Sequence, residues 1–125
     1  MTQPCLDLRE AFGSRFRIRS SEDHLPQAAI DPWNLMIPCS RWRPAFVYPY
    51  GGQTLGAWIT THYVKPALAL LVAAGARPHQ VGDGEATVLF DVADAKAVFK
   101  VLRAIRKRAG RSAEALDAIR PQKAA

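Results

Sequence analysis

Alternation of apolar and polar residues predicts several short strands in this chain. The clearest case is residues 15–19, where an extended backbone places Phe16 and Ile18 on one face and three arginines on the other. These arginines are Arg15, Arg17 and Arg19. Further strands are predicted over residues 35–39, 45–50, 55–59, 79–81 and 86–91.

Apolar residues at helical spacing predict the helices. The predicted helices cover residues 6–12, 60–75, about 94–108 and 112–120. The second is expected to be largely buried, because Leu68, Leu71 and Val72 stand at helical spacing. The third is the longest and is capped by Asp91 or Asp94.

These elements predict an α+β fold. We expect a mainly antiparallel sheet of five or six short strands covered by two helices, with a short N-terminal helix and a basic C-terminal helix and tail. At 125 residues the chain has the usual size of one domain, which we place at residues 1–111, followed by a short helix and tail at 112–125. The segment at 45–50 suits an edge position, because Pro44 and Pro49 cannot donate to a neighbouring strand.

The positive charge of the chain is concentrated near its C-terminal end. The formal net charge is +6; residues 1–91 carry equal numbers of cations and anions, whereas residues 92–125 carry nine Lys and Arg against three Asp and Glu. Clustered charge of this kind favours a polyanionic partner, because it sets a strong local potential and releases counterions on binding. The alternative is a solvated helix face and a soluble tail.

Much of this charge falls on one side of the longest predicted helix and forms a basic stripe. The four cations at helical spacing are Lys96, Lys100, Arg103 and Lys107, and the three that thicken the C-terminal end of the stripe are Arg106, Arg108 and Arg111. Part of this pattern has a structural explanation, because cations near the C-terminus of a helix interact favourably with the helix dipole.

A second candidate contact surface is the hairpin predicted over residues 37–52. Its candidate contact residues are Arg41, Trp42, Arg43, Tyr48 and Tyr50. Aromatic rings can stack on bases, and arginines can contact phosphates. On an extended strand Phe46, Tyr48 and Tyr50 share one face, which is either core or contact surface, while the arginines at the tip are exposed in both cases.

The basic stripe, the arginine face of residues 15–19 and the hairpin together predict a small nucleic-acid-contacting module. We expect it to bind RNA or DNA without sequence specificity, on its own or as a subunit of a nucleoprotein complex. One alternative is a protein-interaction or accessory subunit that docks on an acidic protein surface without contacting nucleic acid. Neither the choice between RNA and DNA nor the oligomeric state follows from the sequence.

A small enzyme is the remaining alternative, although few residues are arranged for catalysis. Asp23 and His24 are adjacent, a pairing that arises from local composition more often than from a catalytic dyad. Cys5 and Cys39 lie far apart with no CxxC motif, so we expect reduced packing residues and neither a metal nor any other cofactor.

A membrane protein is not expected. No apolar run approaches the roughly 18 residues that span a bilayer, and the N-terminal residues lack the basic head and apolar stretch of a secretory signal. The predicted location is the cytoplasm, and no membrane partner is expected.

One stretch resembles a known group of proteins. The pattern is Asp31-Pro32-Trp33, Ile37-Pro38-Cys39, Tyr48-Pro49 followed by Gly51-Gly52, then Leu55 and Ala57. It is similar to a group of small uncharacterised bacterial proteins that share this core and an arginine-rich C-terminal segment, over roughly residues 6–111. Members of that group often carry histidines in the hairpin, whereas residues 42–50 here contain none. The resemblance implies the fold and no function.

Overall fold

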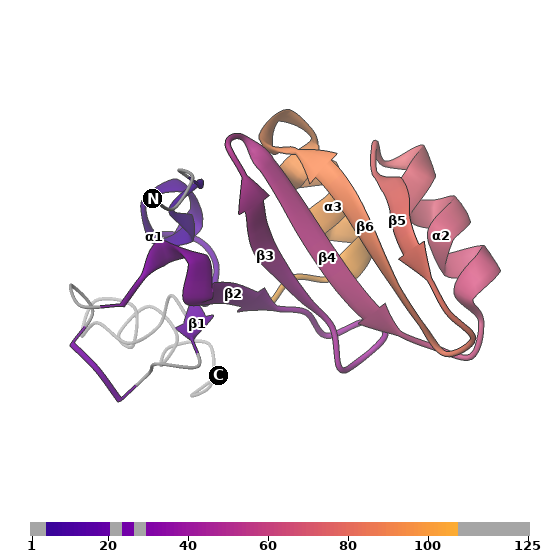
Figure 1. Ribbon diagram of the computed structural model, residues 1–125, viewed down its shortest axis with the longest axis horizontal. Coiled ribbons are helices and arrows are strands. Elements are labelled where there is room, and N and C mark those ends of the chain that lie inside the picture. The colour runs from indigo at the N-terminus through magenta and orange to yellow at the C-terminus, as the bar shows by residue number, and fades with distance from the viewer. Residues whose placement is uncertain (1–4, 21–23, 27–29, 108–125) are drawn as a thin grey trace, which may run out of the picture.

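The computed structural model describes residues 5–20, 24–26 and 30–107 and has the α+β fold that the sequence predicts (Figure 1). The helices are α1 (Leu8–Phe12), α2 (Val64–Ala73) and α3 (Ala95–Leu102), with 3-10 turns η2 (Pro32–Asn34) and η3 (Val92–Asp94). The strands are β1 (Arg19–Ser20), β2 (Leu35–Pro38), β3 (Phe46–Gly51), β4 (Thr54–Thr60), β5 (Arg77–Val81) and β6 (Glu85–Asp91). The helix predicted over 112–120 lies outside the described residues.

The six strands form one antiparallel sheet in the order β1-β2-β3-β4-β6-β5. Strands β4 and β6 pair over their whole lengths, from Thr54 opposite Asp91 to Thr60 opposite Glu85. Strands β5 and β6 form the hairpin predicted around residues 82–84. The central strands β3, β4 and β6 therefore carry most of the core.

The prediction of an edge position for residues 45–50 was wrong, because β3 lies between β2 and β4. The paired residues of β2 stand opposite only Phe46 and Val47, whereas Pro49 pairs with β4 and lies beyond the end of this register. A proline is therefore tolerated in an inner strand, because its missing N–H falls where the pairing of β3 with β2 has already stopped.

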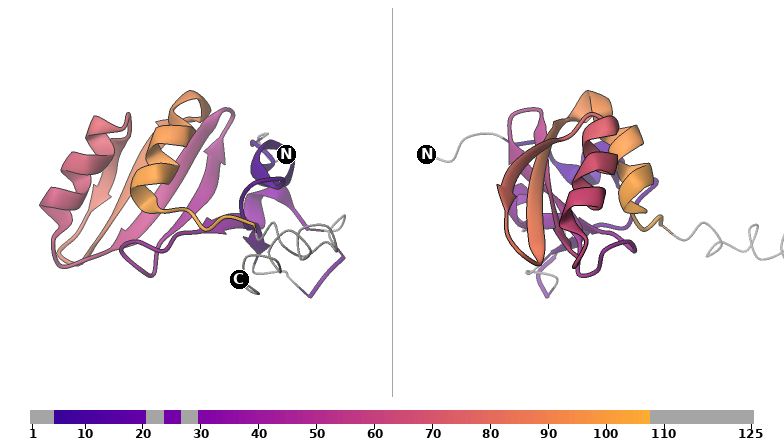
Figure 2. Two further views of the ribbon diagram at one scale, coloured as in Figure 1. Left: turned by 180° about the vertical axis from the view of Figure 1, so that it is seen from behind. Right: turned by 90° about the vertical axis from the view of Figure 1, so that its right-hand side faces the viewer.

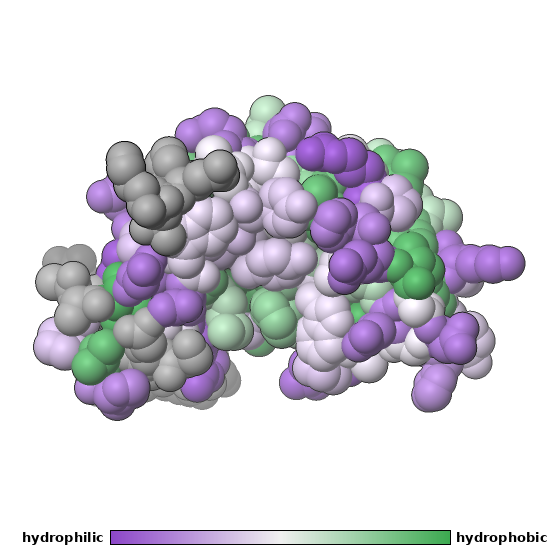
Figure 3. All heavy atoms as spheres, viewed as in Figure 1, coloured by the Kyte–Doolittle hydropathy of each residue, from purple (hydrophilic) through white to green (hydrophobic). Residues whose placement is uncertain are grey.

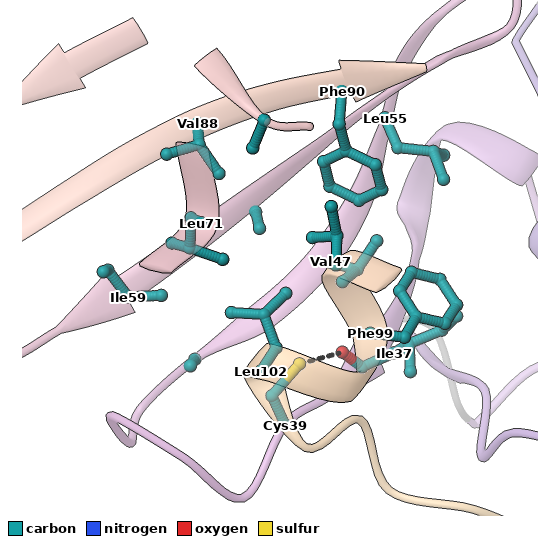
Figure 4. Close-up of a cluster of buried hydrophobic side chains, with 14 of the residues drawn as sticks. Ile37, Cys39, Val47, Leu55, Ile59, Leu71, Val88, Phe90, Phe99 and Leu102 are labelled. Atoms are coloured by element: carbon teal, nitrogen blue, oxygen red, sulfur yellow. Dashed lines mark hydrogen bonds between the residues drawn. The ribbon is translucent and has the colours of Figure 1, made fainter. Parts of the chain in front are cut away.

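Alternation along the central strands gives the sheet one apolar face. Val47, Leu55, Ile59, Val88 and Phe90 are all fully buried on it (Figure 4). Helices α2 and α3 both cover this face, and no helix of the described residues covers the other face of β3, β4 and β6 (Figure 2). The domain thus has two layers, and its core lies between the helices and one side of the sheet.

Helix α2 is amphipathic and not largely buried, which corrects the prediction. Val64, Ala67 and Leu71 face the core, whereas Leu70 and Val72 are 43% and 49% exposed. Each residue advances about 100° around a helix, so Val72 lies well to one side of the face formed by Val64, Ala67 and Leu71. Within the described residues, no helix is long and apolar enough to cross a membrane.

Helix α1 is fixed by Asp7 and by its packing on α3. The Asp7 carboxylate accepts hydrogen bonds from the backbone N–H of Arg9 at 2.9 Å and from its guanidinium at 3.0 Å, which lowers the pKa of Asp7 below its ordinary value. Phe12 is buried, and its ring centre lies 4.9 Å from that of Phe99 in α3.

The strand predicted at residues 15–19 is only partly formed. Phe16 makes an isolated bridge to Arg106, and of these five residues only Arg19 belongs to strand β1. The predicted alternation is nevertheless present, because the three arginines are exposed while Phe16 and Ile18 are half-buried. No strand of the described residues pairs with this segment along its whole length. Its backbone is therefore extended but does not form a continuous strand. We call residues 15–18 the arm.

The Cys39 thiol is buried in the core. It is 1% exposed and its Sγ donates to the carbonyl of Ile37 at 3.7 Å (Figure 4). Burial raises the pKa of Cys39 to about 12, because the thiolate loses its hydration there. The folded protein therefore keeps this proton at a pH where the unfolded chain has lost it.

We expect alkaline pH to weaken the fold through this thiol. Between about pH 9, where an exposed thiol ionises, and about pH 12, the unfolded chain binds fewer protons than the folded one. The free energy of unfolding should then fall by about 1.4 kcal/mol per pH unit more steeply than in Cys39→Ala. Urea unfolding at a series of pH values measures both slopes, and parallel slopes for the two proteins would contradict the prediction.

Helix α2 ends at a glycine, as the sequence predicts. Gly75 has φ +111°, its N–H donates to Val72, and the next N–H, of Ala76, donates to Leu71, both at 3.0 Å. This is the Schellman arrangement, in which a residue with positive φ closes the helix. A side chain at residue 75 would also lie 2.7 Å from the carboxyl carbon of Asp94.

Gly75→Ala should lower the free energy of unfolding by about 2 kcal/mol, because it adds backbone strain and a collision. Gly84→Ala is the matched control, since residue 84 has no positive φ and nothing within 4 Å of the added methyl. We expect a change of less than about 0.5 kcal/mol there. Chemical denaturation compares the two, and equal losses would show that strain at residue 75 is not the cause.

Candidate functional site

Helix α3 ends at Leu102, well before the end that the sequence predicts. Arg103 adopts the left-handed conformation, with φ 56° and ψ 54°, and the N–H of Ala104 donates to the carbonyl of Phe99 at 3.0 Å. A glycine usually closes a helix in this way. The longer helix was predicted wrongly because the first glycine after α3 is Gly110.

The loop between β2 and β3 supplies the partners that this early end requires. The backbone N–H and the Oγ of Ser40 donate to the carbonyl of Arg103 at 2.9 and 3.0 Å. The N–H of Arg41 donates to the carbonyl of Leu102 at 3.2 Å. The last carbonyls of a helix have no partner inside it, so this loop stabilises the helix end from outside.

Arg41 and Trp42 belong to this helix cap. The Nη1 of Arg41 donates to the carbonyl of Val101 at 3.4 Å, and its guanidinium lies 4.4 Å from the centre of the Trp42 ring. Both residues are half-buried, whereas Arg43 is exposed. The prediction that the arginines at the tip are exposed is therefore wrong for Arg41 and right for Arg43.

Beyond α3 the chain is extended and runs towards the part of the molecule that holds α1 (Figure 2). It lies between β2 and the arm. The N–H of Ile105 donates to the carbonyl of Pro38, and the carbonyl of Ile105 accepts from the N–H of Arg17, both at 2.9 Å. Residues 104–107 are thus held on both sides by backbone hydrogen bonds.

This pairing brings cations that are distant in sequence next to one another. The N–H of Lys107 donates to the carbonyl of Arg15 at 2.9 Å, and Arg106 stands opposite Phe16. The arginines of the arm and those after α3 therefore become neighbours. The sequence pattern did not predict this contact, because it assigned residues 104–107 to a helix.

A groove of about 660 Å³ opens between α3, the arm and residues 104–106. The cations that line it are Arg15, Lys96, Lys100, Arg103 and Arg106. No acidic residue lines it in the described part of the chain, and within that part none of the five forms an ion pair with a carboxylate. Cations gathered without a counter-charge create a positive potential that attracts anions.

The floor of this groove is apolar. Phe12, Phe16 and Phe99 line it, and the ring centres of Phe16 and Phe99 lie 5.0 Å apart in an edge-to-face contact. Phe12 and Phe99 are buried, whereas Phe16 is half-buried. No sequence pattern predicted that Phe99 joins the other two, because it is far from them along the chain.

A second hollow of about 360 Å³ lies on the other side of Phe16. Its cations are Arg9, Arg17 and Lys107, and Arg9 is already paired with Asp7 at 3.0 Å. Arg17 and Lys107 extend the group of cations beyond the groove. We call the seven cations that line the two hollows and have no ion pair among the described residues the basic band: Arg15, Arg17, Lys96, Lys100, Arg103, Arg106 and Lys107.

The predicted basic stripe is thus replaced by a band built from three segments. Lys96 and Lys100 are on α3, as predicted, but Lys107 is not on the helix and cannot continue a straight line. Arg19 is exposed at β1 and lines neither hollow. The predicted contacts Arg108 and Arg111 lie outside the described residues.

The aromatic residues of β3 lie on the open face of the sheet, away from the helices. Tyr48 is half-buried, and its ring lies so close over Gly56 that a methyl group there would overlap it. Burial raises the pKa of Tyr48. Tyr50 is 44% exposed, and its ring centre lies 5.4 Å from that of His79.

Trp58 of β4 completes this surface, although sequence reasoning did not single it out. Its ring centre lies 5.3 Å from that of Phe46, and the two line a shallow hollow of about 390 Å³ with Tyr48 and Thr87. Leu55, Ala57 and Ile59 are buried, so the alternation of side chains along a strand would have predicted that Trp58 points outward.

We call Phe46, Tyr48, Tyr50 and Trp58 the aromatic face. Figure 3 views the molecule from this side, where residues of intermediate hydropathy gather over the strands.

The aromatic face and the basic band are two separate surfaces. The basic band lies with α3, which covers one side of the sheet, and Arg41 also contacts this helix. Tyr48 and Tyr50 lie on the other side of the sheet. The structure therefore does not assemble the predicted group of Arg41, Trp42, Arg43, Tyr48 and Tyr50 into one site.

The described residues contain no group of three or more His, Cys, Asp or Glu that could hold a metal ion. Comparison with known proteins finds no matching family model, no similar curated protein and no similar solved structure. The geometry of the basic band and the aromatic face is therefore the basis for a function.

Arg103→Gly should raise the free energy of unfolding by about 1 kcal/mol, because glycine adopts the left-handed conformation without strain. Lys100→Gly, at an exposed position of α3, should instead lower it by about 1 kcal/mol, as glycine does inside a helix. Thermal and chemical unfolding measure both changes. A loss of stability in Arg103→Gly would show that the side chain contributes more to the fold than its backbone strain costs.

Proposed function

We propose that this protein is a small nucleic-acid-contacting module that holds the phosphate backbone of RNA or DNA on its basic band. The observation that carries the proposal is the convergence of five cations on one groove with no acidic residue among its described lining residues. Neutralising several phosphates at once releases condensed counterions, which drives the binding of cationic surfaces to nucleic acids. The predicted cytoplasmic location is compatible with this role.

The lining of the groove supports contact without sequence specificity. Apart from its cations, the described lining residues are phenylalanine, alanine and valine. It therefore lacks the Asn, Gln, Asp and Glu side chains that read base edges in many specific complexes. Contacts from lysine and arginine to phosphates position a nucleic acid and carry no direct sequence information.

The conformation of Arg103 also supports a role for its charge. The chain has an arginine at a left-handed position where glycine would be more stable, and this residue lines the groove. Residues in such strained positions are more frequent at functional sites.

Charge reversal in the band should weaken binding of a labelled oligonucleotide. We expect Lys96→Glu/Lys100→Glu to lower the affinity about 10- to 100-fold at about 50 mM salt, because two phosphate contacts are replaced by repulsion. The slope of the logarithm of affinity against the logarithm of salt concentration should fall by about 2 in magnitude. Fluorescence anisotropy at several salt concentrations measures both quantities.

The matched control is Lys65→Glu/Arg77→Glu, which changes the net charge equally at exposed positions on α2 and β5, outside the band. It should leave the slope nearly unchanged. Equal losses in both double variants would show that net charge alone is responsible. No binding by the unaltered protein at about 50 mM salt would overturn the proposal.

A protein-interaction or accessory subunit is the second candidate, and the aromatic face favours it. Aromatic residues are enriched at protein interfaces; on the open sheet Phe46 contacts the rings of Tyr48 and Trp58, and the exposed Tyr50 contacts that of His79. The oligonucleotide measurement separates the two candidates, because an accessory subunit of this kind would not bind nucleic acid through the band.

A further inference from the structure

We infer that the groove takes a single-stranded segment of nucleic acid, with one base placed over its phenylalanine floor, and discriminates against duplex. This inference rests on the proposed function and specifies its substrate. The groove has an apolar floor beneath a rim of cations, and its volume of about 660 Å³ lies in the usual range of small-ligand sites. A base and its phosphates have the same division into an apolar ring and a charged edge.

A duplex cannot use this floor. Its bases are stacked inside the helix and only phosphates, sugars and base edges face outward. It would therefore meet the cations of the rim and leave the phenylalanines uncovered. A single strand can turn a base away from its neighbours and stack it on an aromatic side chain, a contact that tolerates any base.

Phe16 is the ring available for such a contact. Phe12 and Phe99 are 6% and 3% exposed and hold Phe16 in edge-to-face contacts, at interplanar angles of 77° and 84°. Phe16 itself is half-buried and lines both hollows of the basic band. The guanidinium of Arg106 lies 5.9 Å from its ring centre, so a cation accompanies the ring on the same surface.

The position of this ring is set before any ligand arrives. The N–H of Phe16 donates to the carbonyl of Phe12 at 2.9 Å, and the residues on either side of Phe16 are hydrogen-bonded to Ile105 and Lys107. Lys96 and Lys100 stand on the rim on exposed positions of α3. A ring held in place before binding lowers the ordering cost of binding a base, and the exposed cations beside it are accessible to the phosphates.

The test compares three oligonucleotides of one length with the unaltered protein at about 50 mM salt: a single strand, the same strand in a duplex, and an abasic strand that keeps the phosphates. We expect the single strand to bind about tenfold more tightly than either of the others, since stacking of one base contributes an affinity factor of this order. Equal affinity for single strand and abasic strand would overturn the inference.

Two variants test whether the phenylalanine floor causes the preference for single-stranded nucleic acid. Phe16→Leu keeps an apolar side chain and removes the aromatic ring, so it should lower the affinity for the single strand about tenfold and leave that for duplex unchanged. Tyr50→Leu removes an exposed ring from the aromatic face and should change neither. An equal or larger loss in Tyr50→Leu would place the base on the other side of the sheet and overturn the inference.

Different results would contradict the proposed function and the single-strand site. If no oligonucleotide binds, the proposed function fails and the inference falls with it. If single strand, duplex and abasic strand bind alike and all lose affinity in Lys96→Glu/Lys100→Glu, phosphate contact is supported and the single-strand site is overturned. The abasic comparison uses the unaltered protein, so it decides the question even if Phe16→Leu does not fold.

Discussion

The early end of helix α3 is the constraint on which the rest of the candidate site depends. The carbonyls of Leu102 and Arg103 accept hydrogen bonds from the β2–β3 loop, and Arg103 turns the chain by adopting a left-handed conformation. If the helix continued, residues 104–107 would lie along its axis and the arm would lose its backbone partner. The groove therefore exists because loop hydrogen bonds outweigh the propensity of these residues to continue the helix.

This turn also concentrates charge where it is unfavourable for the isolated fold. The basic band gathers seven cations from the arm, α3 and the segment after it, and none has a carboxylate partner among the described residues. Mutual repulsion and the strain at Arg103 both oppose stability at the same place. A bound polyanion would relieve the repulsion, so binding and local stability would be coupled at this site.

The molecule offers two surfaces of different chemistry, on opposite sides of its sheet. The basic band lies with α3 and the arm, whereas the aromatic face is on the side of the sheet opposite α2 and α3 (Figures 2 and 3). The hairpin that carries the aromatic residues contributes to both, because its loop caps α3 while its strand presents Tyr48 and Tyr50 outward. A nucleic acid on the band would leave the aromatic face free for a protein partner.

Periodicity in the sequence determined the fold class, the central strands, the position of α2 and which residues of a strand share a face, such as Tyr48 with Tyr50 and not with Val47. It could do so because these features depend on local backbone geometry and on which face is buried. Tertiary structure alone decided that the open side of the sheet carries Tyr48, that α3 stops at Leu102, and that Arg15 and Arg106 meet at one groove. These outcomes depend on hydrogen bonds and packing between residues distant along the chain, such as Ser40 with Arg103, which no local pattern encodes.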